Sequence, residues 1–256
     1  AGPFRAFLTI TLPMTRSSLQ AACVLPVTKG MVVKTNTPAI REARKMNLEL
    51  LLSNHDKHCL SCVRNQNCEL QKLCLDLGVE DGDRFAGAMN KYDVDDLSPS
   101  IVRNNNKCVL CRRCVAACGA VQGIGVIGPV YRGFNTAIES PWNMPLVDMA
   151  CINCGQCIAA CPTGALHEKD STKEVWDLLA DPKKHVVVQP APAVRAALGE
   201  EFGMPMGTLV TGKLAAALHR LGFDRVFDTD WAADLTIMEE ASELIGRLKN
   251  GGALPM

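Results

Sequence analysis

Two cysteine runs carry the clearest chemistry in this 256-residue sequence. In each run three cysteines are separated by two residues, and a fourth follows after three more: Cys108-x-x-Cys111-x-x-Cys114-x-x-x-Cys118 and Cys151-x-x-Cys154-x-x-Cys157-x-x-x-Cys161. This spacing is typical of chains that hold two 4Fe-4S clusters, in which the fourth cysteine of each run binds the cluster of the other run. We therefore expect one cluster on Cys108, Cys111, Cys114 and Cys161, and the other on Cys151, Cys154, Cys157 and Cys118.

Zinc is the alternative metal for these runs, because cysteines separated by two residues also suit tetrahedral zinc. A zinc knuckle needs only four thiolates and no third cysteine at this interval, which favours iron–sulfur clusters. The two runs differ in one detail, since Cys161 is followed by Pro162 and Cys118 by Gly119. The glycine should change how the chain leaves the site, and it removes no ligand.

A third motif precedes both runs: His55-x-x-x-Cys59-x-x-Cys62-x-x-x-x-x-Cys68. On a continuing helix or turn, positions 55, 59 and 62 share one face, so an imidazole and two thiolates can converge while Cys68 closes the site from a loop. A neutral imidazole would make a 4Fe-4S cluster less negative, and net charge is one determinant of its reduction potential. A three-cysteine, one-histidine zinc site stays open as the alternative. His58 would face away from the shared stripe.

Helices and turns must position these ligands. Apolar residues recur at helical intervals from Pro38 to Leu52, so a helix should lead into the histidine motif. Cys74 falls on one helix face with Leu70, Leu73 and Leu77 and is expected in the core. Residues 79–100 are acidic and rich in turn formers, which indicates a surface connection, and residues 123–128 and 131–138 suggest two short strands between the cysteine runs.

The last third of the sequence has a different pattern. Residues 185–189 and 225–228 are expected strands, two helices lie between them, and apolar residues from Ile237 to Leu248 predict a long helix ended by Gly251. This order is typical of parallel strands with crossover helices. Because two parallel strands cannot cover the faces of a sheet, we expect further polypeptide or a partner chain to complete the domain.

Composition excludes several classes of protein. Lys plus Arg and Asp plus Glu both number 27, which argues against a nucleic-acid partner bound through phosphate neutralisation. No apolar run approaches the ~20 residues that a membrane-spanning helix needs. Thirteen cysteines without a signal peptide indicate metal-binding thiolates kept in a reducing compartment.

Together these residues resemble the N-terminal part of an iron-only (di-iron) hydrogenase. The resemblance runs from about Cys23 to Met256 and rests on the three cysteine motifs and on the stretches Gln189-Pro-Ala-Pro-Ala-Val-Arg195 and Thr236-Ile-Met-Glu-Glu-Ala241. It implies an α+β fold in four parts. These are a remnant of a 2Fe-2S domain or an unstructured N-terminus (1–37), a His/Cys3 4Fe-4S domain (38–98), a two-cluster ferredoxin-like domain (99–172), and the beginning of an α/β catalytic domain with a parallel sheet (173–256).

The resemblance also implies cofactors. Three 4Fe-4S clusters are expected. Cys23 resembles the last ligand of the 2Fe-2S domain, but the other three cysteines of that domain have no counterpart, so a 2Fe-2S cluster is not expected. The ligands of the family's catalytic di-iron cluster follow the equivalent of Pro255-Met256, so this stretch alone is expected not to turn over hydrogen.

Two further sets of residues are implied by the resemblance. Ala191, Pro192 and Ala193 would form part of the wall of the di-iron pocket, where a helix N-terminus could offer N–H groups to its cyanide ligands; an ordinary strand-to-helix turn is the alternative. Glu240 and Glu243 resemble two carboxylates that pass protons to the active site. Without the resemblance, the helix pattern predicts only that these two residues lie on the solvated face of an amphipathic helix.

The expected function is electron relay between ferredoxin or an NADH-linked partner subunit and a catalytic di-iron cluster supplied by the missing region. The alternatives are an iron–sulfur subunit of an NADH-quinone oxidoreductase or formate dehydrogenase, which share the histidine motif, and a non-catalytic iron–sulfur protein. The expected location is the cytoplasm of an anaerobic bacterium, with a hydrogenosome or plastid as alternatives.

Overall fold

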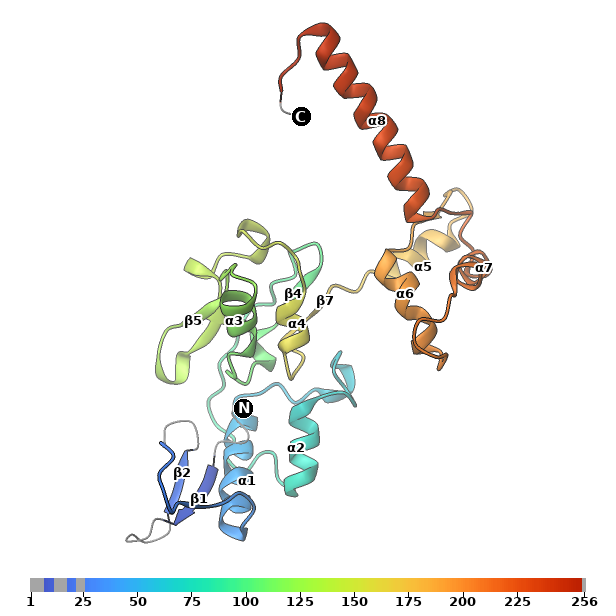
Figure 1. Ribbon diagram of the computed structural model, residues 1–256. Coiled ribbons are helices and arrows are strands. Elements are labelled where there is room, and N and C mark those ends of the chain that lie inside the picture. Colours follow the sequence, from blue (N-terminus) through green and yellow to red (C-terminus); the bar gives the residue numbers. More distant parts are fainter. Residues whose placement is uncertain (1–6, 12–17, 22–25, 255–256) are drawn as a thin grey trace. The chain divides into compact units, whose positions relative to one another are not determined.

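The computed structural model describes residues 7–11, 18–21 and 26–254, and these form two compact units, residues 1–169 and 170–256 (Figure 1). Helices are mixed with small sheets throughout, which confirms the mixed α and β character expected from the sequence. Cys23 lies outside the described residues. Within the described part of the chain, no helix has the length and apolarity that crossing a membrane requires.

The first unit begins with a small antiparallel sheet that was not expected from the sequence. Its strands are β1 (Phe7–Thr11), β2 (Ser18–Ala21) and β3 (Val32–Lys34), and β1 pairs with both of the others. Helix α1 (Pro38–Leu52) follows, as predicted. Thr37 caps it, since the Ile40 N–H donates to Thr37 Oγ1 at 3.3 Å, and proline stands at its first position.

Helix α2 (Glu69–Leu77) packs beside α1 in the same unit. It ends at Gly78, which adopts the left-handed conformation with φ of 65°. Leu48 of α1, Leu70 of α2 and Val109 form one buried apolar cluster. Because Val109 belongs to the first cysteine run, this cluster joins the histidine motif to the two-run region.

The two-run region is built from short elements around one core. Strand β4 (Ile101–Arg103) pairs antiparallel with β7 (Leu166–Glu168), and β5 (Gly128–Val130) pairs antiparallel with β6 (Ala137–Glu139). Helices α3 (Arg113–Ala116) and α4 (Gln156–Ala160) each follow a cysteine loop. The connecting turns are η2 (Cys59–Ser61), η3 (Asn105–Lys107), the π-helical η4 (Ala117–Val121), η5 (Gly133–Asn135), η6 (Pro141–Asn143) and η7 (Leu146–Asp148).

The core of this region places cysteines against aliphatic residues. Its buried members are Ile101, Cys114, Val126, Ile127, Ile138, Leu146, Ile158 and Leu166. Other cysteines of the two runs are partly buried and pack against this core, namely Cys108, Cys118, Cys151, Cys157 and Cys161. Six of the eight cysteines of the two runs are therefore part of the packing of this core, whereas Cys111 packs against the cluster of α1 and α2 and Cys154 is exposed.

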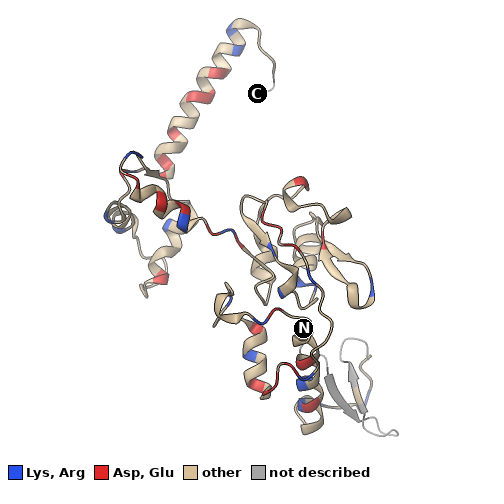
Figure 2. Cartoon of the chain, turned by 180° about the vertical axis from the view of Figure 1, so that it is seen from behind, with Lys and Arg blue, Asp and Glu red and all other residues tan. Residues whose placement is uncertain are grey.

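The second unit has the predicted order of elements. It contains α5 (Thr172–Ala180), β8 (Val187–Val188), α6 (Pro192–Glu201), α7 (Thr211–Leu221), β9 (Arg225–Val226) and α8 (Thr229–Asn250). Strands β8 and β9 pair in parallel, with Val187 opposite Arg225 and Val188 opposite Val226. The apolar side chains of α8, such as Ile237 and Met238, are exposed. Acidic residues run along α8, and its basic residues lie in the last turn, where they suit the helix dipole (Figure 2).

Candidate metal centres

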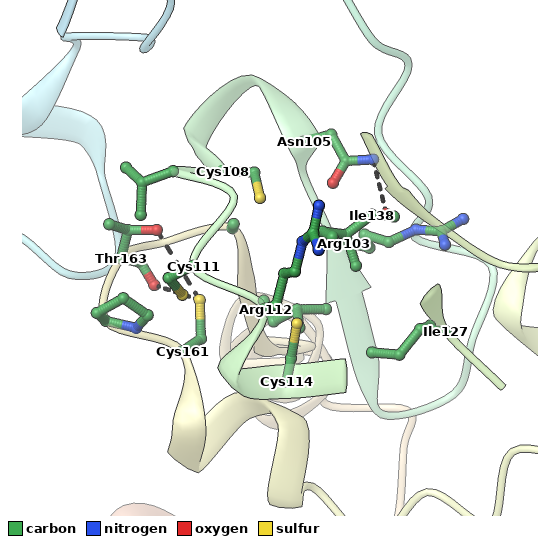
Figure 3. A pocket seen from close by; sticks show the side chains of 14 residues that line it. Arg103, Asn105, Cys108, Cys111, Arg112, Cys114, Ile127, Ile138, Cys161 and Thr163 are labelled. Carbon is green, nitrogen blue, oxygen red and sulfur yellow. Dashed lines mark hydrogen bonds between the residues drawn. The ribbon is translucent and has the colours of Figure 1, made fainter. Parts of the chain in front are cut away.

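The first cavity is lined by four cysteines that come from both runs. Figure 3 shows the sulfurs of Cys108, Cys111, Cys114 and Cys161 around a common space. The first three belong to one run, and Cys161 ends the other run. The structure thus brings together the set of four predicted from the spacing.

A second cavity is lined by the other set, namely Cys118, Cys151, Cys154 and Cys157. Its remaining walls are mostly apolar, and Ile127 and Leu166 line both this cavity and the first. The two cavities are therefore neighbours that share a wall of aliphatic side chains.

The loops around both cavities have the same backbone conformation. Leu110 and Arg112 adopt positive φ values of 54° and 58°, and the equivalent residues of the second run, Asn153 and Gly155, have 53° and 71°. Left-handed residues in such loops turn successive N–H groups inward, which makes a concave site for an anion. The Leu110 N–H donates to Cys108 Sγ at 3.4 Å, as expected for such a loop. A cluster with four thiolate ligands carries net negative charge, so the loops suit it.

The two runs end differently, as the glycine and proline predict. The helical path of α3 continues through Cys118 to Val121, and the Ile124 N–H donates to the Cys118 carbonyl at 2.9 Å. Helix α4 instead ends at Ala160, and Cys161 is extended with φ of −76° and ψ of 121°. The difference follows from Pro162, because a proline disfavours helical backbone in the residue before it.

A third cavity, of about 260 Å³, contains the histidine motif. Its lining includes His55, Cys59, Cys62 and Cys68. The helix does not continue through this motif, because α1 ends at Leu52; Cys59 begins the turn η2, and Cys68 caps α2. Turns rather than one helix face therefore gather the four side chains.

Two other residues of this region, His58 and Cys74, differ in how they lie relative to the third cavity. The His58 side chain is 87% exposed and does not line the cavity, although its Nδ1 lies 2.5 Å from an oxygen of Asp56, which does. Cys74 packs beside the core cluster of α1 and α2, as predicted, but it also lines the cavity. Burial, together with the nearby Cys68 and Cys59, raises the pKa of Cys74 to about 11.

The chemistry of the donor atoms fits metal binding. Burial raises the pKa of Cys108 and Cys114 to about 12 and that of Cys157 to about 11, so as free thiols they hold their protons. A metal converts such thiols to thiolates by displacing the proton. Burial, together with the positive charge of Lys107, lowers the pKa of His55 to about 4, so its ring is neutral. His55 lines the third cavity, and its Nδ1 is buried without a hydrogen-bond partner.

The three cavities differ in size. The free volume is about 20 Å³ in each of the first two and about 260 Å³ in the third. Among the residues that the structure describes, no three His, Cys, Asp or Glu side chains are arranged to hold a single metal ion. The shared lining of each cavity, and not its volume, is what groups the four predicted ligands.

The third cavity adjoins the first through the segment after Cys161. Thr163 lines both cavities. The Glu69 N–H donates to the Pro162 carbonyl at 3.1 Å, and Cys68 Sγ lies 3.8 Å from the same oxygen. The Glu69 carboxylate also forms a bidentate ion pair with the Arg113 guanidinium. These contacts fix the histidine motif against the first cysteine run.

The residues singled out in the second unit lie at a strand-to-helix turn and on a long helix. Ala191 caps α6, which begins at Pro192 and contains Ala193. Glu240 and Glu243 are exposed on α8, and Glu243 forms an ion pair with Arg247 one turn later. These positions are also compatible with an ordinary strand-to-helix turn and a solvated helix face, so the functional roles of the five residues stay predictions.

Three protein families match the chain in consecutive segments. Residues 44–83 match the NADH-ubiquinone oxidoreductase-G iron–sulfur binding region, residues 107–165 match the 4Fe-4S dicluster domain, and residues 184–256 match the iron only hydrogenase large subunit, C-terminal domain. All the predicted ligands of the three cavities fall within the first two segments. The chain therefore contains iron–sulfur cluster-binding domains.

Curated relatives match most of the chain. The NADP-reducing hydrogenase subunit HndD of Solidesulfovibrio fructosivorans is 53% identical over 91% of this chain and 40% of its own length, and iron hydrogenase 1 of Clostridium pasteurianum is 39% identical over 96% and 43%. An NADH-quinone oxidoreductase subunit of Rhizobium meliloti is 39% identical over 58% of this chain and 17% of its own length. The chain thus spans about two-fifths of the length of the two hydrogenase relatives.

A solved structure shares the fold. The crystal structure of an NAD+-reducing NiFe hydrogenase in the H2-reduced state superposes with a TM-score of 0.59 and 24% identity, covering 66% of this chain and 69% of the other. This likeness concerns the fold alone.

Proposed function

Since the chain belongs to the iron-only hydrogenases, of which it carries the iron–sulfur region and the start of the catalytic domain, we propose that it relays electrons through three 4Fe-4S clusters. The relay would connect a ferredoxin or an NADH-linked or NADP-linked subunit with a di-iron cluster that reversibly reduces protons to hydrogen. The ligands of that di-iron cluster would come from polypeptide outside these 256 residues. The location that fits this role is a reducing cytoplasm.

The observation that supports the relay is the arrangement of the three cavities in a row. The first cavity shares Thr163 with the histidine-containing cavity, and it shares Ile127 and Leu166 with the second cavity. The linings of the second and third cavities have no residue in common within the described part of the chain. We infer the order histidine-containing cluster, first cluster, second cluster.

The residues of this chain have separate tasks in such a relay. The cysteines and His55 would hold the clusters, which would supply one-electron uptake and release when bound. The inward N–H groups of the loops offset the negative charge of the thiolates, and the aliphatic walls keep water away from the clusters. We also propose Ala191, Pro192 and Ala193 as part of the di-iron pocket wall, and Glu240 and Glu243 as a proton path, in the complete catalytic domain.

A second candidate function is that of an iron–sulfur subunit of an NADH-quinone oxidoreductase. The match of residues 44–83 and the Rhizobium meliloti relative favour it for the iron–sulfur region. The match of residues 184–256 to the hydrogenase C-terminal domain favours the hydrogenase for the rest of the chain. Because the first function accounts for both regions, we prefer it.

Metal analysis and EPR spectroscopy after anaerobic reconstitution test the proposal. We expect about twelve irons and about twelve acid-labile sulfides per chain, in three clusters that are reduced by one electron each. Zinc in place of iron, or clusters that dithionite does not reduce, would contradict it.

A further inference from the structure

Gly164 occupies the place where the wall of the first cavity meets the histidine-containing cavity. A Cβ atom added at this position would lie 2.8 Å from Cys62 Sγ, 3.4 Å from Lys107 Cδ and 3.6 Å from Val63 Cγ2. A carbon atom cannot approach a sulfur to 2.8 Å without a shift of one of them. The φ of Gly164 is not positive, so packing and not backbone conformation excludes a side chain here.

The wall around Gly164 is held on both sides. Thr163 is 1% exposed, and its Oγ1 donates to the Lys107 carbonyl at 2.8 Å. On the other side, the Ala165 carbonyl accepts the Asn104 N–H at 2.7 Å. The Lys107 ammonium is itself paired with Asp56 at 2.9 Å. A side chain at position 164 would therefore displace Cys62 more readily than the wall.

The closeness of Cys62 to Gly164 makes one of two short routes between predicted ligands of the two sites; the other runs from the Pro162 carbonyl to Cys68 Sγ, 3.8 Å away. Cys62 belongs to the histidine-containing site, whereas Cys161 belongs to the first site and lies three residues before Gly164. The route from Cys161 follows the main chain to Gly164 and then needs one non-bonded contact to the Cys62 sulfur. Electron transfer depends steeply on gaps between non-bonded atoms, so the absence of a side chain at Gly164 matters for the rate.

We propose that Gly164 is a positioning residue that brings the Cys62 sulfur against the main chain after Cys161, and that electrons cross between the histidine-containing cluster and the first cluster at this contact. The inference rests on the proposed relay. When such clusters are bound, each electron that crosses would oxidise one of them and reduce the other. No bond forms or breaks, and no proton moves.

Gly164→Ala in the full chain tests this inference, with Gly87→Ala as the matched control. Gly87 also has no positive φ, and a Cβ there would meet nothing within 4 Å. Freeze-quench EPR follows the rate at which an electron passes between the two clusters, and the spectrum of the histidine-containing cluster reports on its ligand geometry. We expect a several-fold slower transfer and an altered spectrum of that cluster in Gly164→Ala, and wild-type behaviour in Gly87→Ala.

A double-mutant cycle with Cys62→Ser covers the case in which Gly164→Ala assembles poorly. The serine oxygen is smaller than sulfur and lies closer to its own Cβ. Gly164→Ala should therefore have a smaller effect on electron transfer, cluster content and stability when Cys62→Ser is also present. Additive effects, or unchanged rate and spectrum in Gly164→Ala, would overturn the inference. A wild-type chain without reducible clusters would instead refute the proposed relay itself.

Discussion

Replacement of Arg103 by methionine should destabilise the first unit through two carboxylates that lose their cation. Arg103 Nη2 lies 3.1 Å from Asp95 Oδ2 and 3.0 Å from Glu139 Oε2, and Nη1 donates to Ser140 Oγ at 3.1 Å. The side chains of Arg103, Asp95 and Glu139 are only 5%, 11% and 13% exposed. Water can reach the two carboxylates only through the open cavity that all three side chains line, so it should replace the guanidinium only in part.

The structure also indicates the size of the effect. Removing one partner of a buried ion pair costs about 3–5 kcal/mol. Asp95 would keep the Leu146 N–H at 3.0 Å, and Glu139 would keep the Asn105 amide at 2.5 Å, so we expect a value near the lower limit, about 3 kcal/mol. That energy corresponds to roughly a hundredfold change in the unfolding equilibrium constant. It corresponds to a fall of about 6–12 °C in the midpoint of thermal unfolding for a domain of this size.

Loss of the visible iron–sulfur absorbance on anaerobic heating, at one fixed scan rate, measures this midpoint. Arg113→Met is the matched comparison, because the side chains of Arg113 and its partner Glu69 are 31% and 40% exposed and their ion pair should contribute about 1 kcal/mol or less. Arg132→Met, at an exposed position, should have no effect. Equal midpoints for the Arg103 and Arg113 variants would refute the reasoning from burial.

Three further predictions concern the ligands and one helix end. Cys161→Ala should remove the cluster of the first run and Cys118→Ala that of the second run, each with a loss of about four irons. If Cys161→Ala instead removed the cluster of the second run, and Cys118→Ala that of the first, the fourth cysteine of each run would bind the cluster of its own run. His55→Cys should keep its cluster and lower its reduction potential in an EPR-monitored titration, because a thiolate adds negative charge; an unchanged potential would argue against His55 as a ligand. Gly78→Ala should destabilise α2 by about 1 kcal/mol relative to Gly87→Ala, because of these two glycines only Gly78 has a positive φ. Equal midpoints of the two variants in denaturant titration would contradict this.

Local patterns predicted those parts of the molecule that depend on nearby residues. The spacing of the cysteines anticipated which four line each cavity. Three of each set come from one loop, and the fourth, from the other run, was expected from the two-cluster spacing pattern and not from local distance. Apolar periodicity anticipated α1, α2 and α8. The strands between the runs were expected at 123–128 and 131–138 but occur at 128–130 and 137–139, because glycine-rich sequence carries little information on register.

The parts that sequence reasoning missed depend on tertiary contacts. The strands β1 to β3 were not foreseen, and the buried ion pairs of Arg103 join residues that are 8 and 36 positions apart. Gly164 looks like an ordinary turn glycine in the sequence, and only the position of the Cys62 sulfur shows why a side chain is excluded. Cys74 was assigned to the core from its helix face, whereas the structure shows that the same residue also borders a cavity.

The order of the three clusters is the central claim, and EPR spectroscopy of a fully reduced double variant, Cys108→Ala with Cys111→Ala, tests it most directly. Magnetic coupling between clusters falls steeply with distance, so removal of the middle cluster should leave the histidine-containing cluster and the second cluster with separate, uncoupled spectra. The wild-type chain should show coupling of the first cluster to each of the other two. Strong coupling between the two remaining clusters in the double variant would contradict the proposed order.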